Sequence, residues 1–190
     1  MLYAQKHART LVRYDGGGAG DPGSLSRDEV LRTEIIKSRI SFEEADWFVA
    51  RAVDAPWPDV PADATLADAD PAATGGLYDA MDRLYRHFAG RPQVNAAKIS
   101  KVLHLKRPAL YPILDSRLMR SYGPAARRAA ARYPDRGFRR MYWAAVRDDV
   151  MDETNVACLT ALRTELRAAS SPMAGLSDVR LLDIAAWSPS

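Results

Sequence analysis

The segment from Arg91 to Tyr122, RPQVNAAKISKVLHLKRPALYPILDSRLMRSY, constrains the fold more than any other part of the chain. Phe88–Gly90 is expected to close one helix, with Gly90 as a left-handed stop. Arg91–Asn95 is then a short turn, and Ala96–Leu105 forms a second helix whose apolar positions recur at helical spacing. This order predicts a helical hairpin, in which turn amides and a helix N-terminus can face a phosphate.

An aspartate follows the hairpin at a defined place. Pro108 and Pro112 favour an extended backbone over Ala109–Leu114. Asp115 comes directly before Ser-Arg-Leu-Met, a position typical of a helix N-cap, whose side chain accepts backbone N–H bonds. The Asp115 carboxylate either only caps this helix or, held in place by the capping hydrogen bonds, also takes part in a reaction.

Helix signals recur along the rest of the chain. Ser26–Glu29 and Ser41–Glu44 have the spacing of capping boxes, so each predicts the start of a helix. Pro124 fits the first turn of a helix that runs to about Tyr133. Further apolar residues at helical spacing predict helices over 77–88, 137–151, 155–168 and 178–187. We therefore expect an all-α fold, one domain over residues 1–190 with about eight helices and a helix-hairpin-helix-like element over 86–122.

Two polar segments interrupt these helices. Tyr14–Ser24 is rich in glycine but lacks the Gly-Lys-Ser/Thr of a phosphate-binding loop, so we interpret it as a flexible turn. Residues 54–76 contain four prolines, five aspartates and no basic residue. This composition predicts a loop that is either draped over the surface or partly mobile, with Trp57 inserted into an apolar site at one end.

The charge of the chain is divided unevenly. Residues 98–147 hold 13 Lys/Arg against two acids, whereas the remainder holds 14 basic and 22 acidic residues. A strongly basic block in an otherwise acidic chain is typical of a surface that binds a polyanion. The alternative is that the basic side chains pair with the acidic helices of the same molecule.

Composition argues against several kinds of site. Cys158 is the single cysteine, so an internal disulfide is excluded, and its apolar helical surroundings predict a buried thiol. With three histidines and one cysteine, neither a metal site nor a cofactor is expected. No apolar run reaches the roughly 18 residues of a membrane span, and no signal-peptide core is present at the start. These features predict a cytoplasmic protein that does not enter a membrane.

The stretch Pro92–Leu103 resembles the hairpin of helix-hairpin-helix DNA glycosylases, whose motif runs Pro-Gly-Val-Gly, two residues, Thr-Ala and an apolar helix. Aligned without gaps, the essential aspartate of those enzymes falls on Asp115. Gln93 and Asn95 replace the hairpin glycines, and Ala97 stands where bifunctional members carry a Schiff-base lysine. The resemblance implies DNA binding without lyase activity. It also implies that a catalytic Asp115 would stabilise the oxocarbenium-like charge formed when an unstacked base is cleaved off.

Three other segments, 37–48, 106–115 and 179–187, resemble a bacterial family of unknown function. That resemblance implies a single chain-wide domain and gives weight to the Asp115 segment, but it implies no reaction. In the last segment Asp183 lies in an apolar helix three residues after Arg180. We interpret it as a structural ion pair.

Three functions remain open. The favoured one is a nucleic-acid-binding domain, with duplex DNA as the partner. The second is a monofunctional DNA N-glycosylase-like enzyme that uses Asp115. The third is a protein-interaction domain of a bacterial defence or toxin–antitoxin pair, whose basic face meets an acidic partner. The residues expected to bind nucleic acid are Arg91, Asn95, Lys98, Lys101, Lys106, Arg107 and Arg117.

Overall fold

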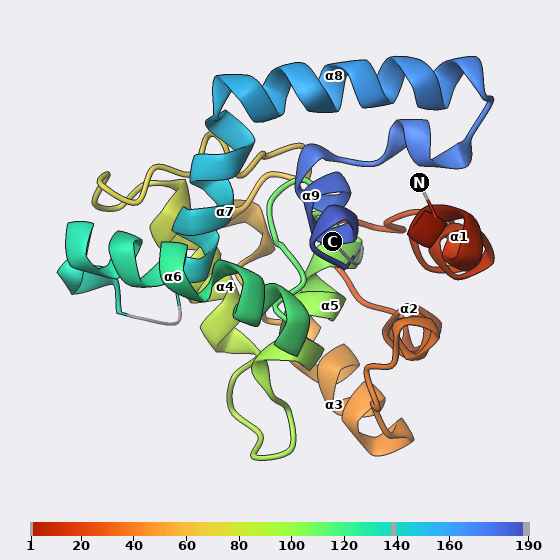
Figure 1. Cartoon of the computed structure of the whole chain (residues 1–190). Helices are drawn as coiled ribbons and strands as arrows, with labels where there is room; N and C mark the ends of the chain where they lie inside the picture. Colours follow the sequence, from red (N-terminus) through yellow and green to blue (C-terminus); the bar gives the residue numbers. More distant parts are fainter. Residues whose placement is uncertain (1, 138–139, 188–190) are drawn as a thin grey trace.

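The computed structural model describes residues 2–137 and 140–187, and all regular structure in these ranges is helical. The expected all-α fold is therefore confirmed (Figure 1). The α-helices of the described part are α1 (Leu2–Asp15), α2 (Arg27–Arg32), α3 (Phe42–Ala52), α4 (Leu77–His87), α5 (Ala96–Lys106), α6 (Ser116–Arg132), α7 (Met141–Met151), α8 (Glu153–Ala168) and α9 (Asp178–Trp187). None of them is long and apolar enough to cross a membrane.

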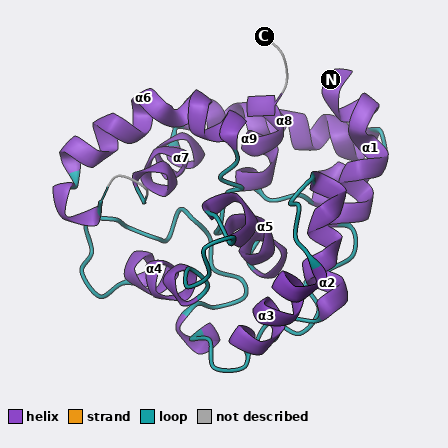
Figure 2. Ribbon diagram, turned by 90° about the horizontal axis from the view of Figure 1, so that it is seen from below, coloured by secondary structure: helices purple, strands orange, loops and turns teal. Residues whose placement is uncertain are grey.

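Helix α5 lies in the middle of the molecule, with α2, α3, α4, α7 and α9 around it (Figure 2). Every residue from Ile99 to Lys106 is buried, including the polar ones. One hydrophobic core connects residues from Leu25 to Val179, which makes the structure a single compact unit. Because α5 is covered on most sides, its polar side chains must find partners inside the protein.

Both predicted capping boxes are present. The Ser26 hydroxyl accepts a hydrogen bond from the Glu29 backbone N–H, and the Glu29 carboxylate accepts one from the Ser26 N–H. Ser41 and Glu44 form the same reciprocal pair at the start of α3. Between these helices a 3-10 helix, Thr33–Ile36, ends at Lys37, whose φ of 60° turns the chain sharply toward α3.

Helix α6 differs from its prediction. Asp115 is its N-cap, as expected, but the helix is continuous to Arg132, and Pro124 lies inside it rather than in a first turn. Pro124 is exposed, while Leu118 and Ala126 on either side of it are buried. Packing of this apolar face against the core compensates for the hydrogen bond that a proline cannot donate.

The acidic segment 54–76 lies over the core and packs several of its apolar side chains against it. The buried hydrophobic residues of this segment are Ala55, Trp57, Val60, Ala64, Leu66 and Ala69. The Trp57 indole N–H donates to the Ala52 carbonyl at 2.9 Å, so the predicted insertion of this side chain is confirmed. Its prolines shape tight turns that follow the core, which composition alone does not reveal.

Two smaller expectations were wrong, and one lies outside the described residues. Helix α4 ends at His87, its C-cap Phe88 has a φ of −94°, and Gly90 does not have a left-handed conformation. Cys158 is exposed rather than buried. Helix α8 runs along one edge of the molecule (Figure 1), so only Leu159 and Leu166 of this helix are buried. Residues 138 and 139, near the start of the helix expected over 137–151, lie outside the described residues.

Candidate functional site at Asp115

A cavity of about 310 Å³ lies beside Asp115. Helix α1, the 3-10 helix, α5, the start of α6 and α9 all contribute to it. Its apolar lining residues are Leu11, Ile35, Ile36, Ile113 and Ile184. Its polar and charged lining residues are Thr10, Lys37, Lys101, Asp115, Arg117, Arg180 and Asp183. Of these, Lys37 and Arg117 are exposed at the rim.

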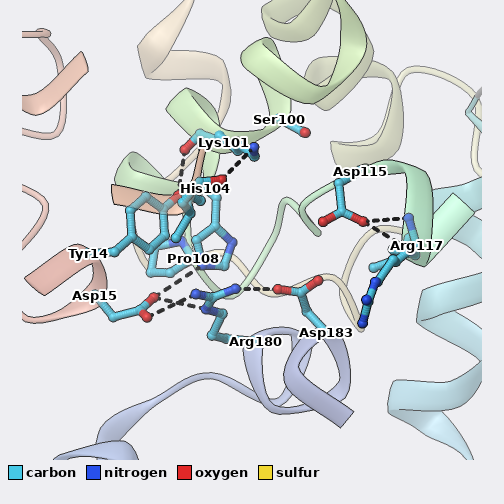
Figure 3. Close-up of polar contacts among 12 residues, drawn as sticks. Tyr14, Asp15, Ser100, Lys101, His104, Pro108, Asp115, Arg117, Arg180 and Asp183 are labelled. Atoms are coloured by element: carbon cyan, nitrogen blue, oxygen red, sulfur yellow. Dashed lines mark hydrogen bonds and ion pairs between the residues drawn. The ribbon is translucent and has the colours of Figure 1, made fainter. Parts of the chain in front are cut away.

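Asp115 is both a cap and a cavity residue. Its Oδ1 accepts hydrogen bonds from the backbone N–H groups of Arg117 and Leu118, each at 2.9 Å. Figure 3 shows its second oxygen pointing away from the helix. The hydroxyl of Ser100 accepts a hydrogen bond from the Leu114 N–H at 3.0 Å, which ties the segment before Asp115 to α5. The carboxylate is therefore fixed at a helix N-terminus, where the helix dipole favours negative charge.

Lys101 brings an amine to the same cavity. Its Nζ donates to the carbonyls of Ile36 at 2.8 Å and Lys37 at 3.2 Å, and the side chain is part of the interior. Burial lowers the pKa of Lys101, and the nearby charge of Asp115 acts in the opposite direction. Lys101 is one of the residues expected to bind nucleic acid, but it is buried, because the 3-10 helix covers this side of α5.

Arg180 joins two carboxylates at the other side of the cavity. It donates to both oxygens of Asp15, at 3.0 and 3.1 Å, and to Oδ2 of Asp183. The predicted pair of Arg180 and Asp183 is thus present, and Asp15 at the end of α1 completes it (Figure 3). Burial raises the pKa values of Asp15 and Asp183, and the guanidinium opposes both shifts.

Tyr14 and His104 pack behind this cluster. The Tyr14 hydroxyl donates to the Lys101 carbonyl at 2.8 Å, and its ring stacks on His104 with 6.1 Å between centroids. Tyr14 therefore lies in the last turn of α1, where it is buried, and is not part of the glycine-rich loop. His104 Nδ1 lies 2.7 Å from the Tyr111 carbonyl, so this nitrogen carries the proton. Burial lowers the pKa of His104 to about 3, which keeps the ring neutral.

Three other basic residues expected to bind nucleic acid form ion pairs or hydrogen bonds within the protein. Lys98 pairs with the buried carboxylate of Glu44 at 2.5 Å. Lys106 pairs with Glu29 at 2.5 Å and its side chain is fully buried. Arg107 donates to the carbonyls of Val60 at 2.8 Å and Pro22 at 3.0 Å. To contact a phosphate, these side chains would first have to break their internal bonds.

The glycine-rich loop takes part in this arrangement. Lys106 Nζ donates to the carbonyls of Ala19 at 2.6 Å and Asp21 at 3.0 Å. A phosphate-binding loop directs N–H groups at an anion, whereas this loop directs carbonyl oxygens at an ammonium. Gly20 has φ +58°, and a Cβ there would lie 2.3 Å from Glu29 Oε1. The loop therefore holds a cation in place.

The remaining expected residues lie at the surface. Arg91 is half-buried, donates to the Glu43 carbonyl at 3.2 Å and pairs with its carboxylate at 3.6 Å. Asn95 is the N-cap of α5 and accepts from the Lys98 N–H. Arg117 is exposed at the cavity rim. Of the expected nucleic-acid-binding set, only Arg117 and Lys101 line the cavity with Asp115.

Helix α6 carries exposed basic residues outside the set that was expected to bind nucleic acid. Arg120, Arg127 and Arg128 are exposed and form no ion pair with any described residue, whereas Arg132 pairs with Asp148 at 2.6 Å. The sequence contained a signal for this basic surface, because positions 120, 127 and 128 fall on one side of a helix. Nothing local pointed to Asp15, because its contact with Arg180 of α9 joins residues that are far apart in the chain.

Comparison with known proteins gives one match. A model of a family of unknown function (DUF6308) matches residues 49–190, about three quarters of the chain. No curated protein and no solved structure matches. The matched part includes Lys101, Asp115 and Asp183, whereas α1 and the 3-10 helix lie before it. The chain therefore belongs to this family of unknown function.

Proposed function

We propose that this chain binds nucleic acid and hydrolyses an N-glycosidic bond in it, with Asp115 as the catalytic carboxylate. The observation that carries the proposal is that Asp115 opens onto a cavity while two backbone hydrogen bonds hold it in place. A carboxylate fixed in this way needs no reorganisation when positive charge develops on a sugar. The hairpin resemblance around Pro92–Leu103 adds a reason to choose DNA as the substrate.

The size and lining of the cavity suit a nucleotide base. A volume of about 310 Å³ is at the lower end of the range for small-molecule sites. Ile35, Ile113 and Ile184 offer apolar surface on which a flat ring can pack. A base in a duplex would have to leave the stack to enter. Hydrolysis by water is the chemistry we propose, because the Lys101 amine is held by two carbonyls and Ala97 has no amine.

Helix α6 supplies the surface that we propose for the phosphate backbone. It begins at the cavity, where Arg117 forms part of the rim, and it exposes Arg120, Arg127 and Arg128 further along. By the rise of an α-helix, Arg117 and Arg128 lie about 16 Å apart along the axis. This row takes the place of the α5 lysines as the expected site of phosphate contact.

The test compares Asp115→Asn with Asp152→Asn. Asp152 is also an N-cap, accepting from the Asn155 N–H at 3.0 Å, but it does not line the cavity. Both variants keep a capping oxygen, so each should fold. We expect wild type and Asp152→Asn to release free base from oligonucleotides with deaminated, alkylated or oxidised bases, measured by mass spectrometry. Asp115→Asn should bind the same oligonucleotides and release base at least about 100-fold more slowly.

A second candidate is a nucleic-acid-binding domain without catalysis, which the exposed arginines of α6 favour by themselves. Salt-dependent binding without base release by the wild type would select it. Absence of any affinity for duplex or single-stranded nucleic acid at low salt would contradict both candidates. The arginine row would then be a surface for an acidic protein partner.

A further inference from the structure

Asp183 faces the same cavity as Asp115 and has one carboxylate oxygen without a partner. Its Oδ2 accepts a hydrogen bond from Arg180, whereas Oδ1 is buried and bonded to no described residue. Figure 3 shows this second oxygen on the side of Asp115. A buried oxygen that lacks a partner costs free energy, which calls for an explanation in a site of this kind.

We infer that Asp183 is the general acid of the site and delivers a proton from Oδ1 to the departing base, while Asp115 stays ionised beside the sugar. The inference rests on the proposed function and adds a second catalytic carboxylate to it. Two carboxylates in different surroundings are the usual means by which one site supplies both an acid and a negative charge.

The charges around Asp183 favour a proton on it. The groups that face it are Tyr14 and Asp15 of α1, Lys101 of α5, Asp115 and Tyr122 at α6, and Arg180 of α9. Burial raises the pKa of both tyrosines far above the usual range, so they are neutral. Arg180 is shared by two carboxylates, and Lys101 is the only other buried cation facing Asp183 in the described part of the cluster.

Three carboxylates thus share two buried cations. Burial raises the pKa of Asp183 to about 7, the charge of Asp115 adds to this shift, and Arg180 opposes it. Since Oδ2 accepts from Arg180, the proton belongs on Oδ1, the oxygen that has no other partner.

The reaction then balances with water as the only co-reactant. The bond between the sugar carbon and the base nitrogen breaks, its electron pair stays with the base, and the base takes the proton of Asp183. A water oxygen bonds to the sugar carbon, and the released proton goes to Asp115. The products are the free base and a sugar hydroxyl, and exchange through solvent returns the proton from Asp115 to Asp183.

Asp183→Asn tests this assignment, because the amide oxygen can still accept from Arg180 but the side chain has no acidic proton. Single-turnover release of base is measured from about pH 5 to about pH 9 for wild type, Asp183→Asn and the control Asp152→Asn. We expect Asp183→Asn to be about 100- to 10,000-fold slower, with unchanged affinity for the oligonucleotide. The wild-type rate should decline above about pH 7, and this decline should be absent from the residual rate of the variant.

The outcomes separate the two proposals. If the wild type releases base and Asp183→Asn does so at a similar rate, the acid is not Asp183, while the role of Asp115 stands. If neither protein releases base from any oligonucleotide, the proposed function fails and this inference fails with it.

A titration gives an answer that does not depend on the variant folding. Carbon-13 NMR of the aspartate carboxyl groups in the wild type should show Asp183 changing charge near pH 7. In Asp115→Asn the midpoint should move down, because a neighbouring negative charge is gone. A carboxyl of Asp183 that remains ionised down to about pH 5 would have no proton to deliver, and the inference would be wrong.

Discussion

Helices α5 and α6 both lie in the basic part of the chain, but they use their positive charge in different ways. Lys98, Lys101 and Lys106 of α5 bond to carboxylates and carbonyls of the same protein. Arg120, Arg127 and Arg128 of α6 point into solvent. The reason is position: α5 is surrounded by other helices, whereas α6 buries one face only. The number of charges in a segment therefore does not say how many are available to a partner.

The largest test of this comparison is Lys106→Met against Arg128→Met. Removing one partner of a buried ion pair leaves the other charge uncompensated, so Lys106→Met should lower the free energy of unfolding by about 3–5 kcal/mol. Arg128 is exposed and unpaired among the described residues, so the same replacement there should change it by no more than about 0.5 kcal/mol. Urea denaturation followed by circular dichroism measures both. Equal changes in the free energy of unfolding would show that burial does not distinguish the charges of α5 from those of α6.

The next test concerns the loop around Lys106. Gly18 and Gly20 both have positive φ, at 68° and 58°, but only at Gly20 would a Cβ meet another group, the Glu29 carboxylate. Gly18→Ala should cost about 1–2 kcal/mol from its backbone conformation alone. Gly20→Ala should cost at least about 1 kcal/mol more, because Glu29 must move away from Lys106. Identical losses in thermal or urea denaturation would mean that the loop does not hold this ion pair.

A third test uses the neutral histidine inside α5. The pKa of His104 is about 3 in the folded protein against an ordinary value of 6.5. Below about pH 6.5 the unfolded chain therefore takes up a proton that the folded protein does not. The free energy of unfolding should fall with decreasing pH by up to about 1.4 kcal/mol per pH unit. His104→Asn keeps an N–H for the Tyr111 carbonyl and should lack this contribution. If the free energy of unfolding depends on pH in the same way for wild type and His104→Asn, the His104 ring is charged or exposed in the folded protein and the prediction is wrong.

The smallest expected effect is on the salt dependence of DNA binding, and it depends on the proposed function. Arg120→Ala should reduce the slope of log K against log salt by about 0.9 on a duplex, because one phosphate contact is lost. Lys98→Met should leave the slope unchanged, because Lys98 already pairs with Glu44. Fluorescence anisotropy at several salt concentrations measures both slopes. A lower slope for Lys98→Met alone would assign DNA contact to α5 instead.

The helical class and several helix starts could be predicted from the amino-acid sequence alone. Ser26, Ser41 and Asp115 all cap helices as predicted, because a cap depends on a side chain and an N–H only a few residues away. The pair of Arg180 and Asp183 could be predicted for the same reason, because the two residues are three positions apart on one helix.

Which groups lie around Arg180 and the cavity, and which charges are free, depends on the tertiary structure. Asp15 and Arg180 are 165 residues apart in the chain, and only the packing of α1 near α9 brings them together. The same holds for Lys106 and Glu29, 77 residues apart. Exposure of Cys158 and continuity of α6 through Pro124 likewise depend on what covers each helix. Local hydrogen bonds are set by neighbours in sequence, whereas burial and ion pairing are set by neighbours in space.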